Sequence, residues 1–594
     1  MAADTQLGVH FKERTLEWWQ QEIKLGLEFR NQVANADREW PLYRQMYRHK
    51  EFGFRSGHKV IPVNFIFAFG RALIPQVAPR RQHITIVADR PGFEAHAKVL
   101  ERLDNKLIET LMLKDELRTM VLDNFLSGIA IGFDGYDSAY GFKPSLTESA
   151  IEHSGTFSQF DKKSGNRIEY NRQVAPGMPW FFRADPEDVV FPWGTYRARE
   201  SQWVALRVMR PVDDIKKDPK YKNASDLKGM HVRRKTMGMD ATPRDPVATP
   251  VSFAEQEEIA ELWQVRDFKT GSILVFTLDH DKFLRNEPDT LQADSSLVHT
   301  VSFNEDVEFV YGIPDARLIL PQQREATEAR TQASFHRRVA ILKFLIKAGA
   351  MKPSDIDKLL DEDVKAAVFV NSEAGPLRDT VITMGAEGTA AILQEMQFSI
   401  NAAREDVREV IGMGRNQLGE FDAKTHRTKF EAAVVQGVSS IRIDERRDML
   451  GDMTINIVKN FNRYMFRHWT AKRLQQILGP DGGRYWVEFT GKELESEYIY
   501  SLSAADAVPV SQATEKQNAL ELLEGWTKYQ PGVPVPKELL RYALSQYPNI
   551  NVEAVLAATP DAMQAGNQSA SGGAPIGLNQ AQALFAQQGG GGIR

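Results

Sequence analysis

The stretch from residue 318 to about residue 470 constrains the fold most, because its apolar residues recur at helical spacing almost throughout. The pattern predicts one helix over residues 318–348, a second over 386–411 and a third over 425–469. Helices that carry an apolar stripe must bury it against another element. The sequence therefore predicts long helices packed side by side, with neighbouring copies of the chain completing the layer.

The first two of these helices have distinct apolar and polar faces. The second carries apolar residues at spacings of three and four, which line one seam: Leu393, Met396, Ile400, Ala403, Val407 and Val410. Its predicted outer face is charged: Glu395, Arg404, Glu405, Arg408 and Glu409. The first helix has an apolar stripe of Phe335, Val339, Leu342 and Ile346. Its polar face consists of Gln332, His336, Lys343 and Lys347.

Two segments interrupt the helices. Residues 351–385 contain Pro353 and a short apolar run at 367–370 that predicts a strand. Residues 412–424 are rich in glycine and polar residues, which predicts a loop. The third helix follows directly after this loop.

The regions on either side mix helices and strands. Helices are predicted over residues 11–50 and over 91–129, the latter ending at Gly128, and a strand over 83–87. Residues 165–210 and 484–503 have β character, and residues 257–285 form the clearest hairpin. Residues 512–558 predict short helices, and the Gln-, Gly- and Ser-rich tail from about 560 predicts disorder. The fold class is therefore α+β and mainly helical.

Composition narrows the function classes. The 594-residue chain has a formal net charge of −5, whereas a protein that grips DNA over its whole surface is usually strongly basic. Cysteine is absent, which excludes disulfides, thiolate metal sites and cysteine nucleophiles. The polar start of the chain is unlike a secretory signal, and residues 60–77 are interrupted by proline and arginine, so no membrane span is predicted.

Motifs for nucleotide, metal or nucleophilic chemistry are missing. The glycines at 412–419 precede no Lys-Ser/Thr pair and follow a helix, unlike a phosphate-binding loop. Asp279, His280 and Asp281 predict a solvated turn, since no further spaced ligands accompany them. Asp134 and Asp137 lack the spacing of a calcium loop. We therefore predict a protein that is not an enzyme and has no cofactor or metal.

Several segments, taken in order, resemble one known family. They include Val63–Phe67 with Ala72–Pro75, Met120–Gly128 followed by Gly132 and Tyr136, Asp185–Phe191 with Trp203–Ala205, and Glu261–Trp263 with the hairpin at Gly271. Lys424 and Thr425 precede the third helix, which carries Arg442, Glu445, Arg446 and Arg447. Over residues 50–560 this order resembles the portal (head-to-tail connector) proteins of tailed bacteriophages.

The resemblance implies a domain organisation. Residues 1–317 would form the N-terminal region and an α/β wing, 318–350 and 386–411 the two stem helices, and 351–385 the clip. Residues 412–424 would form the tunnel loop, 425–511 the long helix and returning wing strands, 512–560 a helical crown, and 561–594 a disordered tail.

The resemblance also implies partners and a location. Portal proteins assemble as a ring, typically a dodecamer, at one capsid vertex of the virion, after synthesis in the host cytoplasm. Double-stranded DNA passes through the ring during packaging and ejection. The partners implied are the terminase motor, the major capsid and scaffold proteins, and the tail adaptor.

A channel must let DNA slide, and in a ring each cation is repeated by symmetry into a belt of charge. The resemblance places Arg415, Asn416, Gln417 and Lys424 in a DNA-facing tunnel loop. On the stem, His336, Lys343 and Lys347 are candidate channel-lining residues, or partners for acidic residues of a neighbouring subunit.

Three other interpretations are open at this stage. The chain could be another head–tail adaptor or minor capsid protein, although the long β-containing region before the stem argues against a small adaptor. A metal-dependent enzyme acting on nucleic acid would need a cluster of carboxylates. A helical scaffold unrelated to phages would be monomeric in solution.

Overall fold

The structure is a computed structural model of the whole chain. It describes residues 12–50, 60–78, 82–136, 159–160, 167–168, 178–217, 221–233, 256–289, 291, 294–339, 343–346, 381–384, 389–413, 429–469, 473–478, 484–502, 512–529, 535, 539–540, 543 and 576–577. The chain is a mixed α and β protein, as the sequence predicts.

The chain divides into two compact units. The first comprises Met1–Trp40, Ala72–Pro314 and Ser440–Arg594, and the second comprises Pro41–Arg71 and Asp315–Ser439. The strands of the six-stranded sheet belong to the first unit, and the predicted stem helices belong to the second.

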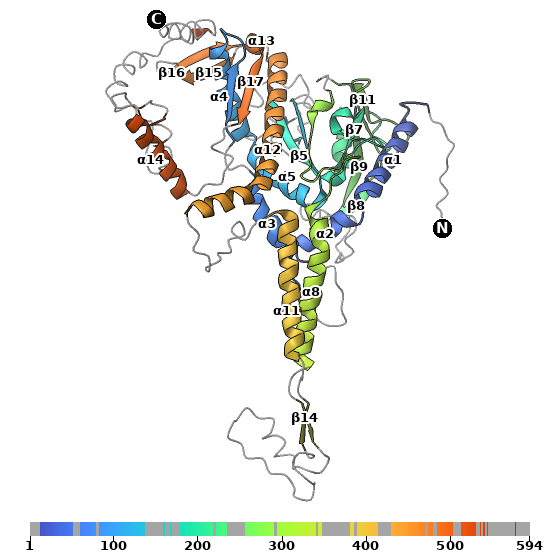
Figure 1. Cartoon of the computed structure of the whole chain (residues 1–594). Coiled ribbons are helices and arrows are strands. Elements are labelled where there is room, and N and C mark those ends of the chain that lie inside the picture. Colours follow the sequence, from blue (N-terminus) through green and yellow to red (C-terminus); the bar gives the residue numbers. More distant parts are fainter. Residues whose placement is uncertain are drawn as a thin grey trace, which may run out of the picture. The chain divides into compact units, whose positions relative to one another are not determined.

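The largest sheet of the first unit has six strands in the order β11-β10-β9-β7-β6, with β8 also paired to β9. Its strands are β6 (Val189–Val190), β7 (Trp203–Pro211), β8 (Met230–Arg233), β9 (Gln256–Asp267), β10 (Ser272–Phe276) and β11 (Arg285–Pro288). The helix α1 (Leu16–Ala34) packs against this sheet (Figure 1). Trp19, Trp203 and Trp263 are buried between them, with the Trp19 and Trp203 ring centroids 5.8 Å apart.

The hairpin β9–β10 confirms the turn predicted at Gly271. Ser272 pairs with Asp267, and Gly271 has a φ of +65°, a conformation that residues with a Cβ rarely adopt. The turn before β6 is also confirmed, since η2 (Pro186–Asp188) begins at Asp185, whose carboxylate accepts from the backbone N–H of Glu187. A short helix, α7 (Val212–Lys217), follows β7 directly.

A second sheet in the first unit has the order β12-β2-β5. Its strands are β2 (Ala130–Tyr136), β5 (Pro179–Ala184) and β12 (Val298–Val301), preceded by η6 (Ser295–Leu297). The helices α4 (Glu94–Thr110) and α5 (Leu113–Ser127) fall within the predicted helical span 91–129. Gly128 caps α5 with a φ of +78°, which confirms the predicted end of the helix.

The other paired strands lie mostly near the C-terminal part of the chain. The predicted strand at 83–87 is confirmed as β1 (Ile84–Ala88), which pairs with β17 (Tyr498–Leu502). A three-stranded sheet joins β15 (Arg473–Leu478), β16 (Arg484–Phe489) and β18 (Ile576–Gly577). The strand β3 (Gln159–Phe160) pairs with β4 (Arg167–Ile168), which completes the sheets that the structure describes in the first unit.

Two residues of the tail that the sequence predicts to be disordered are described: Ile576 and Gly577 pair in parallel with Val487 and Glu488 of β16. The predicted crown helices are represented by α14 (Gln512–Tyr529), and most of residues 530–558 lies outside the described residues. The strand β15 was not predicted, because Arg473–Leu478 alternates weakly and carries two glutamines.

The second unit contains two long helices, α8 (Asp315–Val339) and α11 (Thr389–Ile411), with the strands β13 (Lys343–Ile346) and β14 (Val381–Met384) between them in sequence. Figure 1 shows α8 and α11 side by side, with the β13–β14 pair beyond their ends. We call α8, α11 and this strand pair the arm. Three further helices, α2 (Glu39–Tyr47), α3 (Phe65–Val77) and α12 (Lys429–His468), contain residues of both units.

The turn from α5 into β2 packs closely on Gly312. A Cβ on Gly128 would overlap the carbonyl group of Gly312. The backbone at Gly128 can approach the backbone at Gly312 this closely because neither residue has a side chain. Ser302 donates to the Gly128 carbonyl oxygen at 2.7 Å. The Asn124 side chain bonds the backbone of Val301 and Phe303. These contacts fix the chain a few residues before α8 begins.

We predict that Gly128→Ala destabilises the first unit far more than Gly194→Ala. Both glycines have nearly the same φ, +78° and +76°, so both variants suffer the left-handed backbone penalty of about 1–2 kcal/mol. Only position 128 has no room for a methyl group, which adds about 1–3 kcal/mol. Thermal unfolding of the two variants measures the difference, and equal losses of stability would contradict the account.

Candidate functional site

The arm is held together by a seam of small and branched side chains. Ala403 and Val407 of α11 are fully buried, as are Ile319 and Ala326 of α8. Burying a valine-sized side chain stabilises by about 1.5–3 kcal/mol. The Ser399 hydroxyl donates to the Glu325 carboxylate at 2.6 Å, which places these two residues at the same height along the antiparallel pair.

A second face of α8 binds residues 61–66 of the same unit, the segment that leads into the first turn of α3. Three buried polar side chains, spaced four residues apart, each accept a backbone N–H from it. Gln323 accepts from Ile66 at 2.9 Å. Thr327 accepts from Val63 at 3.2 Å and Thr331 from Ile61 at 3.1 Å. Residues i and i+4 share a helix face, so the three side chains lie in a row on α8. They accept hydrogen bonds from backbone N–H groups that would otherwise be buried without partners.

The α11 seam is partly as predicted. Ala403 and Val407 are buried and Met396 and Ile400 are half-buried, whereas Val410 is 39% exposed. The side chain of Leu393 lies outside the described residues.

On the predicted outer face of α11, four of the five charged residues are exposed and one is not. Arg408 is buried, which corrects the prediction, and its guanidinium pairs with Glu405 at 2.8 Å. Its long apolar stem accounts for the burial, since arginine can lie along a helix surface with its charged group paired.

Phe398 of α11 was not singled out from the sequence, although it is 73% exposed. It lies outside the seam that residues at spacings of three and four form. An aromatic residue at such a position could have indicated an exposed apolar side chain from the sequence alone. Phe335 of α8 is also exposed, at 40%, so the predicted apolar stripe of the first helix is not buried there within this chain.

The predicted first stem helix ends earlier than expected. The helix stops at Val339, and Lys343–Ile346 forms β13, paired with Val381–Met384. Ile346 therefore does not continue the helical stripe, and Leu342 lies outside the described residues. Likewise Lys343 does not share a helix face with His336, which is half-buried near the end of α8. The periodicity of a short apolar run such as Phe344–Ile346 is compatible with either a strand or a helix. The run forms a strand here because it pairs with β14.

The remaining candidate channel residues fall outside the described residues: Lys347, Arg415, Asn416, Gln417 and Lys424. The start of the predicted tunnel loop is described. Gly412 has a φ of +75°, and the backbone N–H groups of Gly412 and Met413 both donate to the Arg408 carbonyl oxygen. This closes α11 in the manner typical of a glycine-terminated helix.

A buried polar cluster in the first unit joins the sheet β12-β2-β5 to α12. The Asp134 carboxylate is fully buried and accepts from Asn460 at 2.7 Å and from Tyr464 at 2.8 Å. The His299 Nε2 lies 2.5 Å from the same carboxylate. Burial, with the nearby Asp134 carboxylate, raises the pKa of Tyr464 well above its usual value, so the phenol stays a neutral donor. The sequence did not reveal this cluster, because its members are far apart along the chain.

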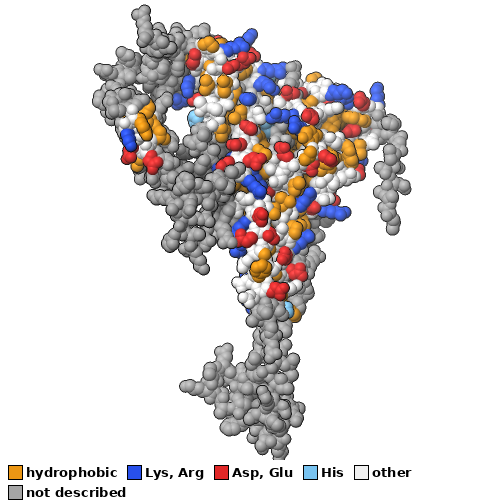
Figure 2. Space-filling model, viewed as in Figure 1, with side chains coloured by type: hydrophobic (Ala, Val, Ile, Leu, Met, Phe, Trp, Pro, Cys, Tyr) orange, Lys and Arg blue, Asp and Glu red, His pale blue; other side chains and the backbone are white. Residues whose placement is uncertain are grey.

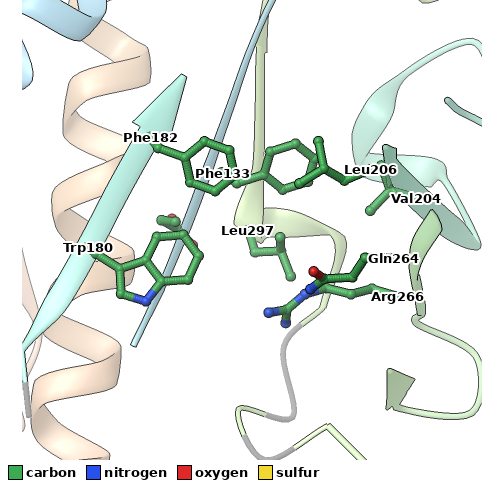
Figure 3. A pocket seen from close by; sticks show the side chains of 9 residues that line it. Phe133, Trp180, Phe182, Val204, Leu206, Gln264, Arg266 and Leu297 are labelled. Carbon is green, nitrogen blue, oxygen red and sulfur yellow. The ribbon is translucent and has the colours of Figure 1, made fainter. Parts of the chain in front are cut away.

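A small cavity adjoins this cluster (Figure 3). Its volume is about 20 Å³, which accommodates about one water molecule. Apolar side chains form most of its wall, and Arg266, which pairs with Asp289 at 2.8 Å, contributes charge. The lining residues are Phe133, Asp134, Trp180, Phe182, Val204, Leu206, Gln264, Arg266 and Leu297.

A wider depression of about 300 Å³ lies in the same unit, lined by Leu103, Lys106, Leu107, Thr110, Met178, Trp469, Gln475 and Phe489. Among the residues that the structure describes, no group of three or more His, Asp or Glu side chains is placed to hold a metal ion. Within the same residues, no helix is both long and apolar enough to cross a membrane. On the face shown in Figure 2, acidic and basic side chains are interspersed among the described residues.

A second buried acid contacts α12. Asp104 of α4 is fully buried, and its Oδ2 accepts from the Asn462 amide at 2.8 Å. Within the described part of the chain its Oδ1 has no hydrogen-bond partner. Asn462 also donates to the Tyr500 hydroxyl at 2.9 Å, and burial raises the pKa of Tyr500 to about 12. Burial likewise raises the pKa of Asp104 well above its usual value.

No protein-family model matches the chain, and no curated protein matches it.

We predict that Asp104→Asn stabilises the protein at pH 8 but not at pH 4. The folded state holds the Asp104 proton more tightly than the unfolded chain does, because burial raises its pKa. The protonated Asp104 side chain therefore makes its full contribution to stability below its unfolded-state pKa of about 3.9. That contribution is lost as pH rises through its raised folded-state pKa. An amide removes this dependence while still accepting from Asn462.

Thermal unfolding at the two pH values measures the effect, at about 1 °C for each kcal/mol in a chain of this length. Asp281→Asn, at an exposed position, is the matched control and should change neither midpoint. A gain for Asp104→Asn that is the same at pH 4 and pH 8 would refute the assignment of a protonated, buried carboxyl.

Proposed function

We propose that this chain is a subunit of the portal ring of a tailed bacteriophage, a channel that is not itself an enzyme and through which double-stranded DNA enters and leaves the capsid at one vertex. The arm is the observation that carries the proposal. Its two helices bury one seam against each other, and α11 presents a broad charged face with the exposed Phe398. A layer of two helices with such outer faces is suited to packing against further copies of itself.

The order of elements supports the same proposal. A mixed α/β region precedes α8, a strand pair separates α8 from α11, and the glycine-rich segment 412–424 leads to the 40-residue helix α12. Strands β15, β16 and β17 follow, and then α14. This is the order that the resemblance to portal proteins implies for wing, stem, clip, stem, tunnel loop, long helix, wing and crown.

The charge balance fits a channel that DNA must slide through. A net charge of −5 gives no general affinity for phosphates, while one cation per subunit becomes a belt of charge in a ring.

The partners proposed are the terminase motor, the capsid and scaffold proteins and the tail adaptor, with the virion vertex as the location. Antibody labelling of intact particles tests this: we expect label at one vertex per head, and label over the whole shell would contradict it.

We predict that Arg415→Ala leaves ring assembly intact and impairs DNA packaging or retention, lowering the yield of DNA-filled heads by about tenfold. The motive is its position among the glycines of the predicted tunnel loop. The matched control is Arg38→Ala, because the Arg38 side chain is 87% exposed on a different segment. Counts of full and empty heads measure the outcome, and normal filling by the Arg415 variant would remove this residue from the DNA path.

A further inference from the structure

The small cavity of Figure 3 lies where the two larger sheets of the first unit face each other. Strands β2 and β5 of one sheet and strands β7 and β9 of the other contribute to its wall. Three of the lining side chains are charged or carry an amide, namely Asp134 of β2 and Gln264 and Arg266 of β9. An otherwise mostly apolar cavity is therefore bordered by a carboxylate, an amide and a guanidinium group.

The Asp134 carboxylate can accept one more hydrogen bond. Its Oδ2 accepts from Asn460 and contacts the His299 ring, whereas its Oδ1 accepts from the Tyr464 hydroxyl. A carboxylate has about four acceptor positions, two on each oxygen. One position on Oδ1 is therefore left over after the contacts with described residues, and Asp134 is fully buried.

The two β9 side chains also have hydrogen-bonding capacity to spare. The Gln264 amide makes no hydrogen bond to another described residue. The buried Arg266 donates from Nη1 to Asp289 at 2.8 Å, and a guanidinium group has five N–H donors in all. Figure 3 shows both side chains extending from β9 toward Leu297. Polar groups in such a place destabilise the fold unless they find partners.

Size and charge limit what could satisfy these groups. A volume of about 20 Å³ is enough for one water molecule, which needs about 10–15 Å³, and for nothing larger. A cation would be repelled by Arg266 and an anion by Asp134. A small neutral molecule that both donates and accepts hydrogen bonds fits all three groups.

We propose that this cavity binds one water molecule, which donates to Asp134 Oδ1 and to the Gln264 side-chain oxygen and accepts from the Arg266 guanidinium group. Three hydrogen bonds are typical of a buried water molecule. The water links β2 to β9, and so joins the sheet β12-β2-β5 to the six-stranded sheet. This inference is independent of the proposed portal function.

The variant Gln264→Met of the full-length chain tests the proposal by the sign of its effect. Methionine is about as long as glutamine but has no amide, so the water loses one of its three partners. We expect the midpoint of thermal unfolding to fall by about 1 °C. Without the water, the same change would remove an amide that lacks a partner, and the midpoint would rise.

The matched control is Gln202→Met, the same substitution at an exposed position of the first unit, which should leave the midpoint unchanged. A crystal structure or cryo-EM map that resolves ordered water should show a peak within hydrogen-bonding distance of Asp134, Gln264 and Arg266. A midpoint for Gln264→Met that is unchanged or raised would overturn the inference. So would a map that has ordered waters elsewhere in the first unit and none in this cavity.

Discussion

The packing of α8 against α11 is the constraint on which the account depends. Ala403 and Val407 bury one side of α11, and the hydrogen bond between Ser399 and Glu325 fixes the register. Because this seam uses only one side of α11, its charged face and Phe398 stay in contact with solvent in the single chain. A second face of α8 is covered by residues 61–66, so the charged face of α11 is the part of the pair that the proposed ring would cover.

The first unit differs from the second in the polar side chains that it buries and must supply with hydrogen-bond partners. Asp134 is satisfied by Asn460, Tyr464 and His299, which come from α12 and β12. Removing one hydrogen-bond partner from such a buried carboxylate destabilises the fold, because the atom left unpaired cannot bond to water instead. The cluster therefore ties α12 to the sheet β12-β2-β5. Asp104 differs, because one of its oxygens has no hydrogen-bond partner among the described residues and burial raises its pKa.

Local signals predicted much of the fold. Short windows of sequence predicted the helix end at Gly128, the turn at Gly271, the strand β1 from its β-branched residues, and the seam at Ala403 and Val407. The end of α8 was missed, because β13 becomes a strand only through β14, which lies far along the chain. The Asp134 cluster was missed for the same reason. Four of the seven channel candidates lie between residues 414 and 428, outside the described residues, and remain predictions.

Electron microscopy of the purified full-length chain tests the central claim most directly. The account predicts closed rings with a central hole wide enough for a DNA duplex, and with the α8–α11 pairs of adjacent copies side by side around it. A chain that remains monomeric at micromolar concentration, or rings in which α8 and α11 make no contact between copies, would contradict it.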